Sequence, residues 1–211
     1  MLMDEPFGAV DPIVRERLQN ELLRLQQRLA KTILFVTHDI DEAIKMADLV
    51  LVLRQGGRLA QFGSPEDVLT HPASDFVARF VGVDRGLKRL SLTRVADIDL
   101  QQPVTCHPGD DSAAARRATA AHPFPYLLLV DHDDRPVGWI HDREIPAGGP
   151  LTMDHAEPAT PFLERQTTLK DALSLLLSAD VLAGVVVDDQ RRLLGVVTLD
   201  QIAAFLREVA R

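Results

Sequence analysis

Two short polar segments carry the residue types that nucleotide hydrolysis requires. Asp4 and Glu5 follow an apolar stub at the start of the chain, and His38 follows a β-favouring run at residues 32–36. Hydrolysis of a nucleoside triphosphate needs a hard oxygen ligand for Mg²⁺, a group that orients water, and neutralisation of charge on the γ-phosphate. Asp4 suits the first task, Glu5 the second and His38 the third.

Parallel strands ending at one edge of a sheet would bring these residues together. The stub and residues 32–36 are predicted to be two such strands, and Asp11-Pro12 has the composition of a helix start between them. Further strands are predicted at 49–53 and 58–62, and a helix begins near Ser64. This alternation predicts an α/β fold. Glu5 and His38, 33 positions apart (38 − 5), are therefore expected to meet at the carboxyl edge.

These segments resemble motifs of ABC transporter ATPases. The matching stretches are Met3-Asp4-Glu5-Pro6 for the Walker B segment, Gly8-Ala9-Val10-Asp11 for the D-loop and Phe35-Val36-Thr37-His38-Asp39 for the H-loop. The resemblance implies that Asp4 holds Mg²⁺ through water, that Glu5 is the catalytic glutamate and that His38 is the switch histidine. It also implies that Asp11 lies at an ATPase dimer interface, although helix capping alone would explain Asp11.

Two phosphate-binding motifs of that family are not found in this chain. No lysine follows a glycine, so there is no Walker A motif, and neither Gly-Gly pair follows a serine, so there is no signature loop. We expect very weak ATP binding and no hydrolysis by this chain alone. Residues 1–82 are expected to have unpaired strand edges and poor stability by themselves. A truncated or mis-started part of a longer protein is the simplest interpretation.

The second half of the chain contains an internal repeat. Val130-Asp131 followed by Gly138 recurs 57 positions later as Val187-Asp188 followed by Gly195. Each copy is predicted to be strand, helix, strand, turn, strand, helix. The predicted helices are 112–121, 169–179 and 199–209, and the predicted strands are 126–130, 137–141, 184–187 and 195–198. Two such copies would bury their apolar faces against each other.

The repeat resembles a tandem pair of CBS domains, most strongly at Val186-Val187-Asp188 and Leu194-Gly195-Val196-Val197-Thr198. The resemblance implies adenine-nucleotide binding between the copies, with Glu144 and Thr198 as candidate ligand contacts. Both copies depart from the family pattern, because His141 replaces the usual hydroxyl residue and Gln201 replaces the usual aspartate. Surface and helix-capping roles are the alternative for Glu144 and Thr198.

The whole chain thus resembles the C-terminal part of a truncated P-loop NTPase (an ABC ATPase, α/β) followed by an α+β tandem CBS pair. The expected domains are the ATPase part at 1–82, a linker at 83–95, and CBS domains at 96–147 and 148–211. This combination resembles the ATP-binding subunits of the quaternary-amine uptake family, which import glycine betaine, carnitine, choline or proline.

That resemblance implies ATP and Mg²⁺ as cofactors, with cyclic di-AMP or another adenine nucleotide at the CBS domains. It implies a membrane permease, a second ATPase subunit in a homodimer and, indirectly, a substrate-binding protein as partners. The implied location is cytoplasmic, on the inner face of the cell membrane. The alternative is a non-catalytic CBS ligand sensor that carries a vestigial ATPase tail.

Composition agrees with these expectations. A net charge of −8 and an isoelectric point near 5.3 argue against a nucleic-acid partner, which needs a basic surface. The single cysteine, Cys106, cannot form an internal disulfide and suits a reducing compartment. The sequence contains no apolar run long enough to be a membrane span, and its first residues lack the pattern of a signal peptide.

Overall fold

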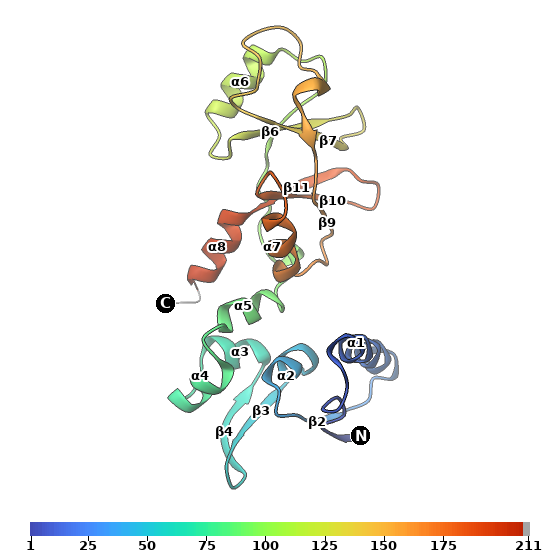
Figure 1. Ribbon diagram of the computed structural model, residues 1–211, viewed down its shortest axis with the longest axis vertical. Helices are drawn as coiled ribbons and strands as arrows, with labels where there is room; N and C mark the ends of the chain where they lie inside the picture. Colours follow the sequence, from blue (N-terminus) through green and yellow to red (C-terminus); the bar gives the residue numbers. More distant parts are fainter. Residues whose placement is uncertain (209–211) are drawn as a thin grey trace. The chain divides into compact units, whose positions relative to one another are not determined.

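The computed structural model describes residues 1–208 of the chain (Figure 1). Two compact units are present, and the second begins at Thr93.

The first unit alternates short strands with helices, as the sequence predicted. Its elements are β1 (Leu2–Asp4), α1 (Pro12–Leu29), β2 (Leu34–Val36), α2 (Ile40–Met46), β3 (Val50–Arg54), β4 (Arg58–Gly63), α3 (Pro65–Thr70), α4 (Asp75–Val81) and α5 (Arg85–Leu90). The predicted helix starts are confirmed. Asp11 Oδ1 accepts the Ile13 and Val14 amides at the start of α1, and Ser64 forms a capping box with Asp67 at the start of α3.

The strands of this unit form two separate pairs. β1 pairs with β2 in parallel, with Asp4 opposite Val36, and β3 pairs with β4 antiparallel. Among the described residues, neither β2 nor β3 has a second strand neighbour. No residue of β1 or β2 is fully buried, and Leu34 and Val36 are exposed. The buried core of the unit lies instead among α2, β3, α3 and α4.

The stretch 83–95, which the sequence predicted as a linker, contains regular structure. Residues Arg85–Leu90 form α5, which packs against α3. Leu90 is completely buried, and Arg89 Nη2 lies 3.1 Å from Glu66 Oε1. Helix α5 is therefore part of the first unit rather than a free connection.

The second unit consists of two similar copies. The first contains β5 (Val104–Cys106), α6 (Ser112–Ala120), β6 (Tyr126–Val130) and β7 (Pro136–His141). The second contains β9 (Phe162–Leu163), α7 (Leu169–Leu177), β10 (Ala183–Val187), β11 (Leu193–Thr198) and α8 (Leu199–Glu208). Short 3₁₀ turns at Val95–Asp97 and Met153–His155 precede the two copies, and β8 (Glu157–Pro158) follows the second turn.

One predicted helix is absent, and the predicted end of another lies outside the described residues. The final helix predicted for the first copy is wrong, because residues 142–149 form turns and irregular structure. Two prolines and two glycines within residues 146–150 disfavour a helix there. In the second copy α8 is described to Glu208, so the predicted end of that helix at Val209 lies outside the described residues.

The copies exchange segments along the edges of their sheets. β8, which leads into the second copy, pairs with β7 of the first to complete the order β5-β6-β7-β8. In return Gln101, before the first copy, forms a bridge with Val196 in β11. The repeated glycines lie at these crossings. A Cβ on Gly138 would come within 2.7 Å of Ala156 Cβ, and one on Gly195 within 2.8 Å of Leu100 Cβ.

The hairpin turns of the two copies are built alike. Asp131 Oδ1 accepts the amides of Asp133 and Arg135 at 2.8 and 2.9 Å. Asp188 Oδ1 accepts the equivalent amides at 2.8 Å each. Residue 134 and its equivalent 191 both adopt a positive φ, of 59° and 63°. The hairpins also touch each other, since Leu193 N–H donates to Asp134 O at 2.9 Å.

Candidate functional site

The ends of β1 and β2 place Glu5 and His38 at one edge of the first unit. Both strands run in the same direction, so their carboxyl ends meet. Glu5 donates its amide to Val36 O at 2.8 Å, which extends the strand pairing by one residue. Its φ of 44° is unusual for a residue with a side chain and turns the backbone away from the strand.

Glu5 and His38 are in direct contact, as their predicted positions at the sheet edge required. Glu5 Oε1 lies 2.9 Å from His38 Nδ1. Both side chains remain open to solvent, with 51% of Glu5 and 74% of His38 exposed. The hydrogen bond with Glu5 and its negative charge raise the pKa of His38 above the ordinary 6.5, because they stabilise the imidazolium. The arrangement pairs a carboxylate that can orient water with a cation that can face a phosphate.

Asp4 is the last residue of β1, and its side chain is exposed beside this pair. Its carboxylate is the hard oxygen ligand that Mg²⁺ prefers, and Mg²⁺ usually takes only one or two protein carboxylates together with water and phosphate oxygens. One exposed carboxylate at the strand end fits that donor set.

Asp11 is the N-cap of α1, since its Oδ1 accepts the Ile13 and Val14 amides at 3.1 and 3.2 Å. It lies on the loop that begins at Glu5, and that loop is held by hydrogen bonds from Gly8 N to Glu5 O and from Val10 N to Phe7 O, both 3.1 Å. Capping thus accounts for Asp11 within this chain. A role in contacting a second subunit stays a prediction.

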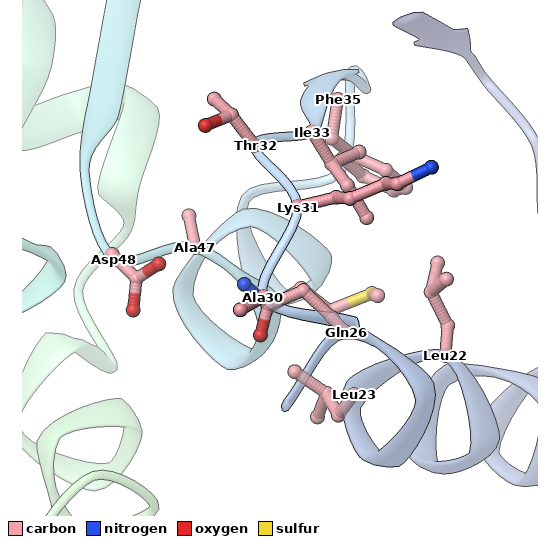
Figure 2. Close-up of a pocket in the computed structure, with 11 residues that line it drawn as sticks. Leu22, Leu23, Gln26, Ala30, Lys31, Thr32, Ile33, Phe35, Ala47 and Asp48 are labelled. Carbon is pink, nitrogen blue, oxygen red and sulfur yellow. The ribbon is translucent and has the colours of Figure 1, made fainter. Parts of the chain in front are cut away.

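A pocket of about 350 Å³ lies away from these residues. It is lined by the end of α1, the residues leading into β2, and the end of α2. In Figure 2 the side chains of Ile33 and Phe35 lie across from those of Leu22 and Leu23. Asp4, Glu5 and His38 are not among its lining residues. Since the predicted chemistry is at the opposite end of β2, we attach no catalytic role to this pocket.

The CBS candidate Thr198 is engaged in local structure. It ends β11, is only 5% exposed, and its amide donates to Gln201 Oε1 at 3.0 Å. Gln201 in turn donates its amide to Thr198 Oγ1 at 3.3 Å and its side-chain Nε2 to Asp99 O at 2.8 Å. Both side chains therefore hold the start of α8, and Gln201 also binds the backbone at Asp99.

The corresponding turn of the first copy is more open. Glu144 is exposed on the turn after β7, and its amide donates to His141 O at 2.9 Å. His141 Nδ1 lies 2.6 Å from Asp142 Oδ1 and accepts the Arg143 amide at 3.2 Å. Glu144 and Thr198 belong to different copies. A ligand-binding role for either residue stays a prediction.

Sequence reasoning missed a buried carboxylate beneath the Glu5–His38 pair. Glu42, in α2, is only 6% exposed and contacts Thr37 and Gln19. The sequence signal was present but ambiguous, because Glu42 follows the helix cap Asp39 by three residues, a spacing typical of an exposed capping box.

Among the described helices, none combines the length and the apolar character that crossing a membrane requires.

Comparisons with known proteins agree with both resemblances. The family model for the CBS domain matches residues 95–145 and 157–208. The chain is 39% identical over 207 residues to the osmoprotectant import ATP-binding protein OsmV of Salmonella typhimurium. It is 39% identical over 206 residues to the choline transport ATP-binding protein OpuBA of Bacillus subtilis. These alignments cover 98% and 94% of this chain, but 54% and 53% of the relatives.

A solved structure, the CBS-pair protein CBSX2 from Arabidopsis thaliana, shares the fold. It is 19% identical, with a TM-score of 0.51, and the match covers 56% of this chain and 97% of that one. The chain spans about half the length of the curated relatives it matches. The chain contains a CBS domain pair and, over nearly its whole length, is a homologue of ATP-binding subunits of osmoprotectant ABC transporters.

Proposed function

We propose that this chain forms the Walker B, D-loop, H-loop and regulatory part of an ATP-hydrolysing subunit that drives osmoprotectant import. The observation that carries the proposal is the contact between Glu5 and His38 at the carboxyl edge of β1 and β2, beside the exposed Asp4. The names of the two relatives, an osmoprotectant import subunit and a choline transport subunit, support the same class of substrate. Quaternary amines are therefore the transported class that we propose.

Each residue has a distinct part in the proposed hydrolysis. Asp4 would hold Mg²⁺ through water, and the metal would supply positive charge to the phosphate oxygens. Glu5 orients the attacking water and accepts its proton. His38, whose pKa is raised by Glu5, presents a positive charge to the γ-phosphate. Asp11 would face the second subunit of an ATPase dimer, because it lies on the loop that leaves Glu5.

The remaining partners follow from the same proposal. A membrane permease would couple hydrolysis to transport, and a substrate-binding protein would deliver the quaternary amine to it. The subunit would therefore work in the cytoplasm, against the inner face of the membrane. The CBS pair would adjust transport by binding an adenine nucleotide, cyclic di-AMP included, with Glu144 the more accessible of the two candidate contacts.

The test compares Glu5→Gln with the unaltered sequence in a complete transporter subunit that contains this chain. We expect the variant to keep ATP binding and to lose at least about 100-fold in turnover, because a positioned acid–base group contributes about 10²–10⁴-fold. Uptake of labelled glycine betaine or choline should fall in parallel. Glu21→Gln is the matched control, since Glu21 is an exposed α1 residue whose described partner is Arg24. Hydrolysis retained by Glu5→Gln would refute the assignment.

A further inference from the structure

The carboxylate of Glu42 is buried beneath the site and is contacted by three residues, Thr37 after β2 and Gln19 and Arg15 of α1. Its Oε2 accepts a hydrogen bond from Thr37 Oγ1 at 2.8 Å, and its Oε1 accepts one from Gln19 Nε2 at 3.2 Å. Arg15 Nε lies 3.8 Å from the same Oε1. A carboxylate is costly to bury unless hydrogen bonds and a counter-charge compensate it. These contacts compensate the burial of the Glu42 carboxylate.

Through Thr37, Glu42 fixes the backbone on both sides of His38. The Thr37 hydroxyl has one proton, which it gives to Glu42, and its lone pairs then accept the Asp39 amide at 3.0 Å. His38 is the residue between these two anchored positions. The orientation of the Thr37 hydroxyl is dictated by Glu42, because an ionised carboxylate can only accept.

Through Arg15, the same carboxylate reaches the loop that begins at Glu5. Arg15 Nη2 donates to Val10 O at 3.0 Å, and Val10 N–H donates back along the loop to Phe7 O. Arg15 also lies 3.9 Å from Asp39 Oδ2, on the His38 side. One guanidinium therefore connects both loops, and Glu42 supplies the negative charge beneath it.

We propose that Glu42 is a positioning residue that holds Glu5 and His38 in register. It anchors Thr37 on the His38 loop, and it anchors Arg15 of α1, which in turn holds the Glu5 loop at Val10. Glu5 and His38 are mostly exposed side chains on separate loops, and such pairs hold each other only weakly. The buried network supplies the rigidity that the surface pair lacks. The consequence for catalysis rests on the proposed function, whereas the positioning itself can be measured in the chain as it is.

The first measurement is an NMR pH titration of the His38 ring in the full chain. In the unaltered chain Glu5 raises the His38 pKa above 6.5. Thr37→Val removes the hydroxyl but leaves every charge in place, so we expect it to lower the His38 pKa, as Glu5→Gln should. Thr37→Ser keeps the hydroxyl and is expected to restore the value. Glu42→Ala should lower it too, but the charges of Asp39 and Glu42 also act on His38, so Thr37→Val is the decisive variant.

The second measurement is ATP hydrolysis by the complete subunit. Thr37→Val and Glu42→Gln are expected to lower kcat about tenfold or more with little change in the KM for ATP, since a misplaced His38 affects the transition state more than binding. The control Glu21→Gln should leave both parameters unchanged.

The outcomes separate the two proposals. If Glu5→Gln hydrolyses ATP normally, the proposed function fails, while the His38 titration still judges the role of Glu42. If Thr37→Val and Glu42→Ala titrate like Glu21→Gln, the positioning role is overturned, even if they melt at lower temperature. An ordinary His38 pKa in the unaltered chain overturns it as well.

Discussion

The strands of the two units differ in how well they are covered. In the second unit, four of the five residues of β6 and four of the five of β10 are buried. In the first unit, no residue of β1 or β2 is buried, and the apolar side chains Leu2, Leu34 and Val36 are exposed. The CBS pair covers its sheets with its own segments, whereas residues 1–208 leave the candidate catalytic strands β1 and β2 uncovered.

This difference has a simple physical origin. Burial of apolar area is the main stabilising contribution to a fold, and strands left with exposed faces and unpaired edges gain little of it. The segment exchange in the CBS pair covers the sheets of both copies at once. The candidate catalytic edge of the first unit is held mainly by two short strands and the Glu42 network.

The largest expected effect is a separation of the two units on heating. We expect two transitions in calorimetry of the full chain, with residues 1–92 unfolding first. Amides in β1 and β2 should exchange with solvent at least about 100-fold faster than those in β6 and β10, because local stability follows burial. Residues 93–211 expressed alone should retain the upper transition. One cooperative transition for the entire chain would contradict this picture.

A smaller effect is expected from a methyl group placed at the crossing of the CBS copies. Gly138→Ala would bring its Cβ within 2.7 Å of Ala156 Cβ and 3.1 Å of Glu157 O, so the crossing segment must move. We expect a loss of about 1–3 kcal/mol in the stability of the second unit, as for other overpacked sites. Gly148→Ala is the matched control, since a Cβ there meets nothing within 4 Å. Denaturant unfolding measures both variants, and equal stabilities would rule out the tight crossing.

The smallest expected effect is a pH dependence confined to the first unit. The pKa of His38 in the folded chain is raised above 6.5, so the folded state binds the proton more tightly. Its contribution to stability is complete below pH 6.5 and is lost as pH rises through the folded-state pKa. His38→Asn should remove this dependence from the lower transition, while His155→Asn, an exposed residue of the second unit, should not. A lower transition with the same pH profile in His38→Asn would exclude the contribution.

Much of the fold could be predicted from local patterns. Helix starts at Asp11 and Ser64 followed from capping chemistry, and the 57-residue repeat located the hairpins of both copies. The contact between Glu5 and His38 followed from the rule that parallel strands share a carboxyl edge. These features depend on short-range sequence or on one general topological rule.

The features that could not be predicted depend on long-range packing. β8 is two residues long, and nothing in Glu157-Pro158 itself indicates that it pairs with the other copy. Glu42 has the sequence context of a surface cap, and its burial arises only because Gln19 and Thr37 meet it from other elements. The final helix of the first copy is absent for a local reason, because Pro146 and Pro150 disfavour it. The prediction followed the repeat pattern instead of these prolines.

The matching hairpin turns suggest how the second unit arose. Asp131 and Asp188 make the same pair of backbone hydrogen bonds, and the same position three residues later is left-handed in both copies. Duplication of one ancestral gene segment accounts for agreement at this level of detail. The aspartate that shapes the turn is the same in both copies, whereas Glu144 of the first copy corresponds to Gln201 of the second. The two copies therefore share the hairpin turn and differ in the segment after it, which forms helix α8 only in the second copy.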